Sequence, residues 1–540
     1  MSEIRNLTDE HAQLLRAAIE GRISRREIIR RGVTLGLASP ALAGLMMAYR
    51  PVATFAADAT PASGAVPAMT DSAAMKGKSV DMTILGIAGW PPSSMGVTLA
   101  TELFKPYAKQ SLGYDVNFSF EDSPFDKLFA KAASSLSTKS AQYNIIISDS
   151  QWLGALAEPG WIVQLNGIID QNPDLNIEFV DTAQKGYRVY PDGSDKLWGF
   201  PQEGDTIALY VRKDLFTDQK ERDAYKAANN GEDLPQTFED WEKVDIDQFE
   251  RIAKFFHRPD QGYAGTSFQF SKVYDFVSCY SYPFMFSTGG EIIEGDVGSY
   301  KIEGVLDSDI NAKGLARAKD FLKYGPDGMT NYGISEEVDA FTAGKLATCL
   351  QWSALGFSML NIDSKDPSKP ADATKPMTRD KALIVPPPGF KQADGSLKRL
   401  YTLGGQPWVI NAFNDPDHMR VAIDFMKWWY SPNTQKEFAK RGGNPTDKAT
   451  LDAPGFDDLQ PHFRAFRYML EGNSRDFWHD PNYSEMLSTQ QEAFNGYMTG
   501  VVSDPMKALK YTACKQQGIL YDNERTNVQP SNACTDITLS

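Results

Sequence analysis

Cysteine and histidine are scarce in this sequence, and neither forms an arrangement typical of a metal or redox centre. The 540 residues include four cysteines, and no two of them make a CxxC pair, which argues against a zinc knuckle or a redox motif. The five histidines are scattered without metal-ligand spacing. The sequence therefore predicts no metal ion and no cofactor.

Clusters of positive charge are also missing beyond the first 31 residues. The formal net charge is −15, and an acidic chain without a basic patch argues against nucleic acid or an anionic membrane as its partner. Hydrophobic residues make up 42% of the chain, which at this length is ample for a large core divided between two lobes.

No catalytic signature is present in the sequence. The chain has neither a nucleophile elbow with its partners nor a GxxxxGK[ST] or GxGxxG loop, so we predict that it is not an enzyme. Glu203 and Asp205 form a carboxylate pair at i, i+2, and on a strand-like loop both would point the same way. Three interpretations of this pair stay open: acid/base chemistry on a glycoside, hydrogen bonding to sugar hydroxyls, and a solvated surface.

The first 56 residues have the pattern of an export signal. A basic stretch around Arg25 and Arg26 precedes an uncharged apolar segment, 32–47, and a zone of small residues near 53–57. The apolar segment is short for a spanning helix, and the paired arginines resemble a twin-arginine signal. An uncleaved anchor or a basic cytoplasmic helix is the alternative. Residues 57–78, rich in Ala, Pro, Ser and Met, are predicted to be a flexible linker.

Alternating strands and helices are expected to begin near Val80. The pattern predicts strands over 81–87, 114–120 and 143–147 and helices over 98–109 and 125–136. This order, with near-continuous apolar strands, is typical of an α/β protein whose parallel sheet is covered on both faces. Ligands of such sheets bind beyond the carboxyl ends of the strands, which here carry Trp90 and residues 149–152.

Five tryptophans stand at predicted strand ends and in loops. A pyranose has apolar C–H faces and a rim of hydroxyls, so aromatic rings bury its faces while Asp, Glu and Gln side chains bind its rim. Core packing is the alternative for each ring, but several stand close in sequence to Asp149, Gln351 or Gln406, which favours a sugar site. The five are Trp90, Trp152, Trp352, Trp408 and Trp478.

An interrupted strand is predicted over residues 402–412. Gly404, Gly405 and Pro407 break its pattern, and paired glycines in a strand mark a bend or a close backbone approach. We interpret this segment as a hinge strand that crosses between two lobes, with Trp408 facing the cleft. An ordinary turn with a tryptophan in the core is the alternative.

Several motifs occur in a common order between residues 80 and 500. They lie at 198–201 with 209–216, 341–348, 404–411, 425–429, 435–439, 442–446 and 481–483. In this order they resemble extracellular solute-binding protein family 1, the carbohydrate-binding proteins of ABC importers, to which maltose-binding protein belongs. The inserted segment 217–247 and the cysteine-bearing tail lie outside the resemblance.

The resemblance implies an α/β fold of the two-lobe periplasmic-binding-protein class, type II-like, in which each lobe is a mostly parallel sheet flanked by helices. Hinge strands would join the lobes near residues 204–206, 403–407 and 441–444. The first lobe would span residues 79–205 and 408–441, and the second would span 206–403 and 445–540.

The implied function is that of an exported, monomeric solute-binding protein that closes on a carbohydrate and delivers it to the permease of an ABC importer. A polyamine, with Asp149, Glu203 and Asp205 as ammonium partners, is one alternative ligand, and a secreted glycoside hydrolase is another alternative. The resemblance and the chemistry of the residues together predict this ligand-binding set: Trp90, Asp149, Ser150, Trp152, Gln202, Glu203, Asp205, Gln351, Trp352, Gly405, Gln406, Trp408, Trp478 and Tyr483.

The cysteines support a separate prediction about the compartment. Cys514 and Cys534 stand in a polar tail without a core pattern of its own, and a disulfide between them fits an oxidising compartment. Cys279 and Cys349 lie in apolar segments and are expected either to pair or to stay as small buried side chains. No cysteine precedes Cys279, so the lipid-bearing cysteine of many exported binding proteins is missing, and we expect a periplasmic or extracellular location.

Overall fold

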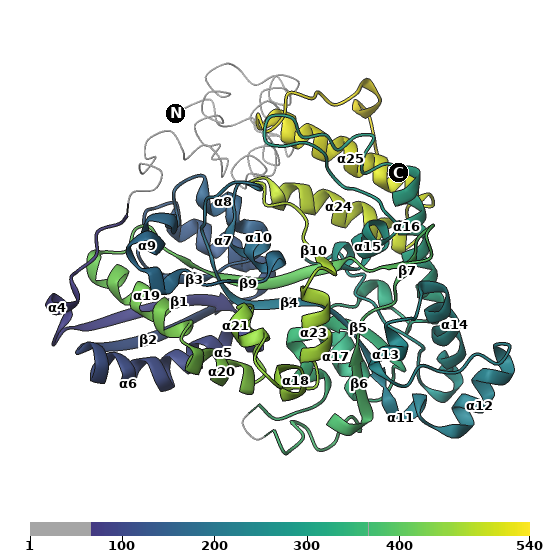
Figure 1. The fold of residues 1–540 in the computed structure, drawn as a ribbon. Coiled ribbons are helices and arrows are strands. Elements are labelled where there is room, and N and C mark those ends of the chain that lie inside the picture. Colours follow the sequence, from purple (N-terminus) through teal and green to yellow (C-terminus); the bar gives the residue numbers. More distant parts are fainter. Residues whose placement is uncertain (1–65, 365–366, 540) are drawn as a thin grey trace, which may run out of the picture.

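The computed structural model describes residues 66–364 and 367–539 of the chain. The predicted export signal, residues 1–56, lies outside them. Figure 1 shows a central sheet with helices on both of its faces. The strands are β1 (Ser79–Ile87), β2 (Asp115–Ser123), β3 (Ile145–Ile147), β4 (Phe200–Arg212), β5 (Thr348–Trp352), β6 (Ala382–Val385), β7 (Phe390–Lys391), β8 (Leu397–Lys398), β9 (Tyr401–Ile410) and β10 (Ser474–Arg475).

The helices fall into three stretches of the chain. Those before β4 are α4 (Ser72–Met75), α5 (Pro91–Leu99), α6 (Lys105–Tyr107), α7 (Phe125–Leu136), α8 (Leu153–Ala157), α9 (Asn166–Gln171) and α10 (Asp181–Arg188). Those between β4 and β9 are α11 (Lys213–Phe216), α12 (Gln219–Ala228), α13 (Phe238–Trp241), α14 (Ile246–Phe256), α15 (Phe276–Ser287), α16 (Asp309–Asp320), α17 (Ile334–Thr342) and α18 (Gly356–Met359). Those after β9 are α19 (Pro416–Trp429), α20 (Pro432–Lys440), α21 (Lys448–Leu451), α22 (Phe456–Leu459), α23 (Phe463–Leu470), α24 (Tyr483–Met498) and α25 (Pro505–Asp522).

The main sheet of the described residues has eight strands in the order β2-β1-β3-β9-β4-β5, with β6 paired to β4 and β10 paired to β9. Strand β1 is parallel to β2 and β3, whereas β9 is antiparallel to β3 and β4. We call the part built from β2, β1 and β3 the β1 side, and the part built from β5, β6 and the second half of β4 the β5 side. The alternation of strands and helices predicted for residues 80–147 is confirmed.

Strand β3 and the second half of β1 are buried because their sequences are apolar at the right spacing. All three residues of β3 are buried, and a strand covered on both faces needs no polar alternation. Helix α7 presents Leu128, Ala132 and Leu136 to the core, and residues four apart lie on one face of a helix. Helices α7, α5 and α19 pack against β1.

Strands β4 and β9 link the two sides of the sheet. Strand β4 pairs with β9 over residues 200–206 and with β5 and β6 over residues 207–212. Gly204 lies opposite Gly405 in this register, and its N–H donates to the carbonyl oxygen of Asn444 at 2.9 Å. The three segments that the resemblance marked as crossings therefore meet at Gly204.

Strand direction on the β5 side differs from the mostly parallel sheet that was expected for each lobe. Strands β5 and β6 both run antiparallel to β4. Strands β5 and β6 therefore run in the same direction. Strand β4 lies between them and runs in the opposite direction. Among the paired strands of the main sheet in the described residues, the parallel pairs are those of β1 with its two neighbours and of β9 with β10.

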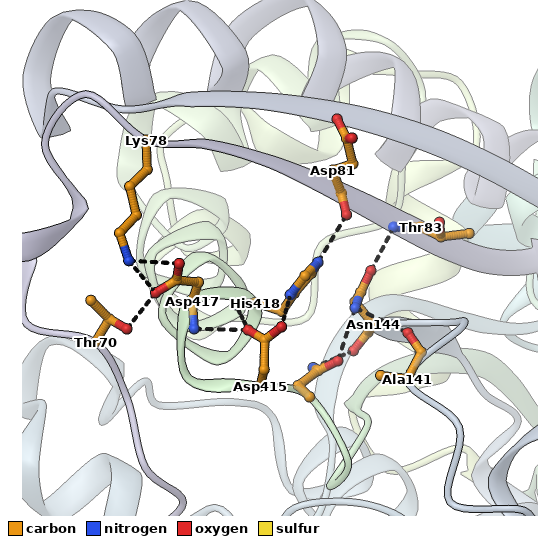
Figure 2. Close-up of polar contacts among 10 residues, drawn as sticks. Thr70, Lys78, Asp81, Thr83, Ala141, Asn144, Asp415, Asp417 and His418 are labelled. Carbon is orange, nitrogen blue, oxygen red and sulfur yellow. Dashed lines mark hydrogen bonds and ion pairs between the residues drawn. The ribbon is translucent and has the colours of Figure 1, made fainter.

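Residues 70–78 are part of the folded structure, so the prediction of a flexible linker is wrong for them. Helix α4 buries Met75 completely. Lys78 Nζ lies 2.7 Å from both carboxylate oxygens of Asp417 in the first turn of α19, and Thr70 donates to the same carboxylate (Figure 2). Composition did not reveal these contacts, because the partner of Lys78 lies 339 residues further along the chain.

The C-terminal segment is joined to α25 by the predicted disulfide between Cys514 and Cys534, which is confirmed. Cys279 and Cys349 are buried free thiols, so the possible second disulfide is not formed and the alternative of small buried side chains holds. Within residues 66–364 and 367–539, no helix combines the length and the apolar character needed to cross a membrane.

Candidate ligand site at the crossing strands

Three loops meet at the crossing strands β4 and β9. Trp90 follows β1, residues 149–152 follow β3, and Ser353 follows β5. The turn after β3 packs beside β9, and α5, which begins directly after Trp90, packs beside the turn after β5. The ends of β1 and β3 therefore converge where the sequence predicted a ligand site of an α/β sheet.

Glu203 on β4 and Gln406 on β9 face each other in this region. The indole Nε1 of Trp90 donates to Glu203 Oε1 at 2.6 Å and to Gln406 Oε1 at 3.0 Å. Glu203 is fully buried, and its other oxygen, Oε2, has no protein hydrogen-bond partner. Burial raises the pKa of Glu203 well above its usual value, and the charge of Asp205 adds to the effect. A buried carboxyl oxygen of this kind is stabilised by a donor, such as a hydroxyl.

Asp205, two residues further along β4, is held by donors of the protein. Its Oδ1 accepts from Ser353 Oγ at 2.7 Å, from the N–H of Ala354 at 2.9 Å and from the N–H of Thr206 at 2.8 Å. Burial raises the pKa of Asp205 to about 7, although these hydrogen bonds lower it. Asp205 thus fastens the loop after β5 to β4, whereas Glu203 keeps an oxygen for another donor.

Two glycines let β9 approach the bulky side chains around it. Gly405 has a φ of +89°, and a Cβ there would lie 2.5 Å from the hydroxyl oxygen of Tyr187 and 2.7 Å from the carbonyl oxygen of Glu203. A Cβ on Gly404 would lie 2.6 Å from the ring of Trp352. The glycines that the sequence marked are therefore required for close packing at the crossing.

Asp149 caps the turn that follows β3. Its Oδ1 accepts from Ser150 Oγ at 3.1 Å and from the N–H of Gln151 at 3.2 Å, and its Oδ2 accepts from the hydroxyl of Tyr274 at 2.9 Å. Burial raises the pKa of Asp149 to about 6, and a neighbouring carboxylate adds to the shift. Both carboxylate oxygens of Asp149 are thus engaged within the protein.

Trp408 does not face a cleft, so that prediction is wrong. Its side chain is fully buried, and its ring centre lies 5.5 Å from that of Phe425 and 5.4 Å from that of Trp429. Helix α19 supplies both neighbours and packs its aromatic face on this part of β9. The tryptophan lies in the core, as in the alternative weighed for this segment, but the segment is a strand, β9, and not an ordinary turn.

Trp152 and Tyr483 lie together, as the predicted set implied, but inside an aromatic cluster. Trp152 is fully buried, and its ring centre lies 5.6 Å from Phe125, 5.5 Å from Phe129 and 6.5 Å from Tyr483. Its Nε1 donates to the hydroxyl of Tyr274 at 3.0 Å. Trp152 therefore has protein neighbours where the sequence suggested a sugar.

The remaining tryptophans of the predicted set differ in how far they are covered. Trp90 and Trp352 are exposed by 9% and 8%, whereas Trp478 is exposed by 3% and packs against Tyr282. Trp90 contacts β4 through its hydrogen bond to Glu203, and the ring of Trp352 lies close to Gly404 on β9. These two predicted rings therefore lie beside the crossing strands.

Two glutamines of the predicted set contact the protein in different places. Gln202 Nε2 donates to the carbonyl oxygen of Pro92 at 3.1 Å, while its Oε1 has no protein partner. Gln351 lies in a separate buried cluster, where its Nε2 donates to Glu337 Oε2 at 3.2 Å and its Oε1 accepts from Gln269 at 2.8 Å. Gln351 is therefore engaged on the β5 side.

Sequence reasoning missed Tyr274, Ser353 and Tyr187. Tyr274 and Ser353 each bind a carboxylate of the predicted set, and the hydroxyl of Tyr187 accepts from the N–H of Asp205 at 3.3 Å. The position of Ser353 directly after a predicted strand was a usable signal. Nothing local marks Tyr187 or Tyr274, because their roles depend on contacts with distant segments.

Residues 102–460 match the sequence profile of a family described as bacterial extracellular solute-binding protein, and this match covers more than half of the chain. The chain belongs to the bacterial extracellular solute-binding protein family. The predicted family relationship is confirmed, and members of such a family bind their solute outside the cytoplasm. No curated protein matches the chain.

Solved structures of ABC-transporter solute-binding proteins share the fold of this member. A protein of Agrobacterium radiobacter K84 in complex with ribitol is 21% identical, with a TM-score of 0.64, and the match covers 81% of this chain and 98% of that one. Maltose-bound MalE3 of T. maritima is 19% identical, with a TM-score of 0.62 and coverage of 80% and 98%. The GacH receptor of Streptomyces glaucescens, solved unliganded and with acarbose, is 15% identical, with a TM-score of 0.62 and coverage of 82% and 99%. The predicted two-lobe α/β fold is confirmed.

Proposed function

We propose that this protein is the exported solute-binding component of an ABC importer, which holds a carbohydrate or polyol between its lobes and delivers it to the permease. In this proposal residues 79–205 and 408–441 form the first lobe, and residues 206–403 and 445–540 form the second. A twin-arginine signal within residues 1–56 directs export, and the protein acts as a monomer.

The observation that carries the ligand class is the unpartnered Oε2 of Glu203. Gln202 Oε1 and Gln151 Oε1, on the same strand and on the turn after β3, are also buried without a protein partner. The two amide oxygens accept hydrogen bonds, and the carboxyl oxygen accepts one or, when protonated, donates one, so these atoms suit hydroxyl groups, which donate and accept, as in a sugar or polyol. The related proteins crystallised with ribitol, maltose or acarbose support the same class.

Trp90 and Trp352 are the rings proposed to contact the ligand. Each is nine-tenths buried beside the crossing strands, and the helix after Trp90 lies beside the turn after Trp352. An indole face buries the apolar C–H face of a sugar while the carboxyl and amide groups bind its hydroxyls. The proposed contact set is therefore Trp90, Gln151, Gln202, Glu203, Trp352 and Gln406.

Capture is proposed to depend on closure of the two lobes. The lobes are joined by β4, by β9 and by the segment at Asn444, which meet at Gly204. A solute that contacts both lobes only in the closed form binds that form more tightly and shifts the population towards it. The closed, loaded protein is then the form that the permease receives.

Glu203 and Asp205 are proposed to bind and position, and not to catalyse. Asp205 Oδ1 accepts from three protein donors, which suits a structural role. Glu203 Oε1 is held by Trp90, which leaves Oε2 as its free acceptor. A glycosidase needs two carboxyl groups that both reach the scissile bond, whereas Asp205 is fastened through its Oδ1 to the loop after β5.

The proposal is tested by a thermal-shift screen of the purified protein against ribitol, hexitols, maltose and acarbose, with spermidine as the polyamine arm, followed by calorimetry. We expect stabilisation by at least one sugar or polyol, because a ligand that binds only the folded state raises the unfolding temperature. Stabilisation by spermidine alone would establish the polyamine alternative, and turnover of an aryl glycoside would contradict the absence of catalysis.

Glu203→Gln is the matched test of the site. It replaces the free acceptor oxygen or the acceptor of Trp90 with an NH2 group, so we expect affinity for the ligand to fall by about tenfold or more. Glu178→Gln is the control, since Glu178 is an exposed carboxylate paired with Lys448. Equal affinity of the two variants would remove Glu203 from the site.

A further inference from the structure

We infer that Tyr274 is a positioning residue that fastens the two lobes together beside the ligand. The inference rests on the proposed function, because it treats the β1 side and the β5 side as parts of lobes that open and close. It adds a residue outside the predicted ligand set and assigns it to the contact between the two lobes in this structure rather than to the solute.

The loop that carries Tyr274 is anchored on the β5 side. The N–H of Ser271 donates to the carbonyl oxygen of Tyr332 at 3.1 Å, and the N–H of Val277 donates to the carbonyl oxygen of Ser271 at 3.1 Å. Helix α15 begins two residues after Tyr274, is buried over almost its whole length and packs against α16. The backbone of Tyr274 is therefore fixed to the second lobe.

The side chain of Tyr274 reaches the first lobe. Its hydroxyl donates to Asp149 Oδ2 at 2.9 Å and accepts from Trp152 Nε1 at 3.0 Å. Its ring centre lies 4.5 Å from that of Phe125 on α7. All three partners belong to the segment from α7 to the turn after β3, so one side chain joins the lobes through two hydrogen bonds and a ring contact.

The partners of the Tyr274 hydroxyl are oriented for it. Ser150 and Gln151 hold the other oxygen of Asp149, which leaves Oδ2 for the tyrosine. Trp152 is fully buried, and its single polar side-chain atom is committed to the same hydroxyl. A hydrogen bond to a carboxylate is stronger than one between neutral groups, so Asp149 contributes most of the energy of this contact.

The backbone of Tyr274 indicates that the contact constrains the loop. Its φ is +46°, in the left-handed region, which is unfavourable for a residue with a bulky side chain. Such a conformation persists only where surrounding contacts hold it, and at Tyr274 the hydroxyl contacts all lie on the opposite lobe. The conformation of this loop and the closure of the lobes are therefore coupled.

Hydrogen exchange of the full chain without ligand tests the inference in wild type, Tyr274→Phe and Tyr324→Phe. Tyr324 is the matched control, because its hydroxyl also donates to a carboxylate, that of Glu250 at 3.0 Å, within the second lobe. We expect Tyr274→Phe to raise exchange both at residues 271–278 and across the interface at residues 145–158, and Tyr324→Phe to change neither. Faster exchange confined to residues 271–278 would overturn the inference.

Ligand kinetics supply a second readout once a solute is in hand. We expect Tyr274→Phe to raise the dissociation rate constant about tenfold with little change in association. Asp149→Asn should raise the same rate constant by a smaller factor, and the double variant should do no more than Tyr274→Phe, because the asparagine weakens one of the two hydrogen bonds that the phenylalanine removes. Additive effects would contradict the inference. Absence of any solute binding by wild type would defeat the proposed function, while the exchange experiment would still decide the role of Tyr274.

Discussion

The indole N–H of Trp90 is shared between Glu203 Oε1, at 2.6 Å, and Gln406 Oε1, at 3.0 Å. One side chain from the loop after β1 therefore holds the two crossing strands in register at the polar centre of the region. Since Trp90 satisfies only one oxygen of Glu203, the other is left for a donor that the protein does not supply.

Replacing Trp90 by Phe is expected to weaken ligand binding by about tenfold, because it removes the shared donor and frees Glu203 Oε1 to rotate away. Trp198→Phe is the matched control, since the Nε1 of Trp198 also donates a hydrogen bond, to the carbonyl oxygen of Tyr190 at 2.7 Å. Calorimetry on both variants measures the effect. Equal losses of affinity would show that Trp90 acts through general stability alone.

Trp408→Ala should damage stability and Trp352→Ala should damage binding. Trp408 is fully buried between Phe425 and Trp429, so truncation leaves a cavity and is expected to cost about 3–5 kcal/mol in the free energy of unfolding. Trp352 keeps an exposed edge beside the crossing strands, so its truncation should lower ligand affinity with a smaller loss of stability. Urea unfolding and calorimetry on both variants measure these losses. A larger loss of stability for Trp352→Ala than for Trp408→Ala would contradict the assignment.

Gly405→Ala is expected to destabilise the fold more than Gly231→Ala. Both glycines have φ above +80°, so both alanines carry backbone strain of about 1 kcal/mol. A Cβ at Gly405 also lies 2.5 Å from the hydroxyl oxygen of Tyr187, whereas at Gly231 it meets nothing within 4 Å. The difference between the losses of unfolding free energy in the two variants therefore measures the cost of the close approach at Gly405. Equal losses would show that β9 can move away from Tyr187.

Removal of the disulfide by Cys514→Ser with Cys534→Ser should loosen the C-terminal segment. The bond closes a loop with a sequence separation of 20, and its loss is expected to lower the free energy of unfolding by about 3 kcal/mol. The same segment carries Arg525, whose Nη1 lies 2.9 Å from Glu158 Oε1 and whose Nε lies 2.8 Å from Asp480 Oδ2. Urea unfolding reports the change, and an unaltered midpoint would mean that contacts such as those of Arg525 hold the segment without the disulfide.

Stability should contain a component that falls as the pH rises. Burial raises the pKa of Asp205 to about 7 and that of Asp149 to about 6, above the ordinary value of 3.8. Between the ordinary pKa and the raised pKa of each group, the folded state binds more protons than the unfolded state. The contribution to stability is therefore full below about pH 4 and is lost as the pH rises through the folded pKa values. Asp205→Asn should flatten the decline in thermal midpoint between pH 5 and pH 8, and Asp181→Asn, at an exposed i, i+4 pair, should not. Identical profiles for the two variants would contradict the raised pKa of Asp205.

Local patterns in the sequence were sufficient for much of the fold. The apolar run that became β3 and the four-residue spacing of Leu128, Ala132 and Leu136 are set by neighbours along the chain, which is why the strand and helix order of the β1 side was predictable. The glycines at 404 and 405 likewise marked the crossing, because a close backbone approach restricts side-chain size at the position itself.

The sequence by itself therefore determined the class of fold, the crossing segments and the disulfide of the tail, and it supplied the carboxylate and indole groups that are proposed to contact a solute. Only the tertiary structure decided that Trp408 packs in the core while Trp90 binds Glu203, that β4 opposes β5 and β6, and that Tyr274 spans to Asp149. The physical reason is that each of these depends on which distant segment covers a residue, and burial against a distant partner leaves no periodicity in the chain for a pattern to detect.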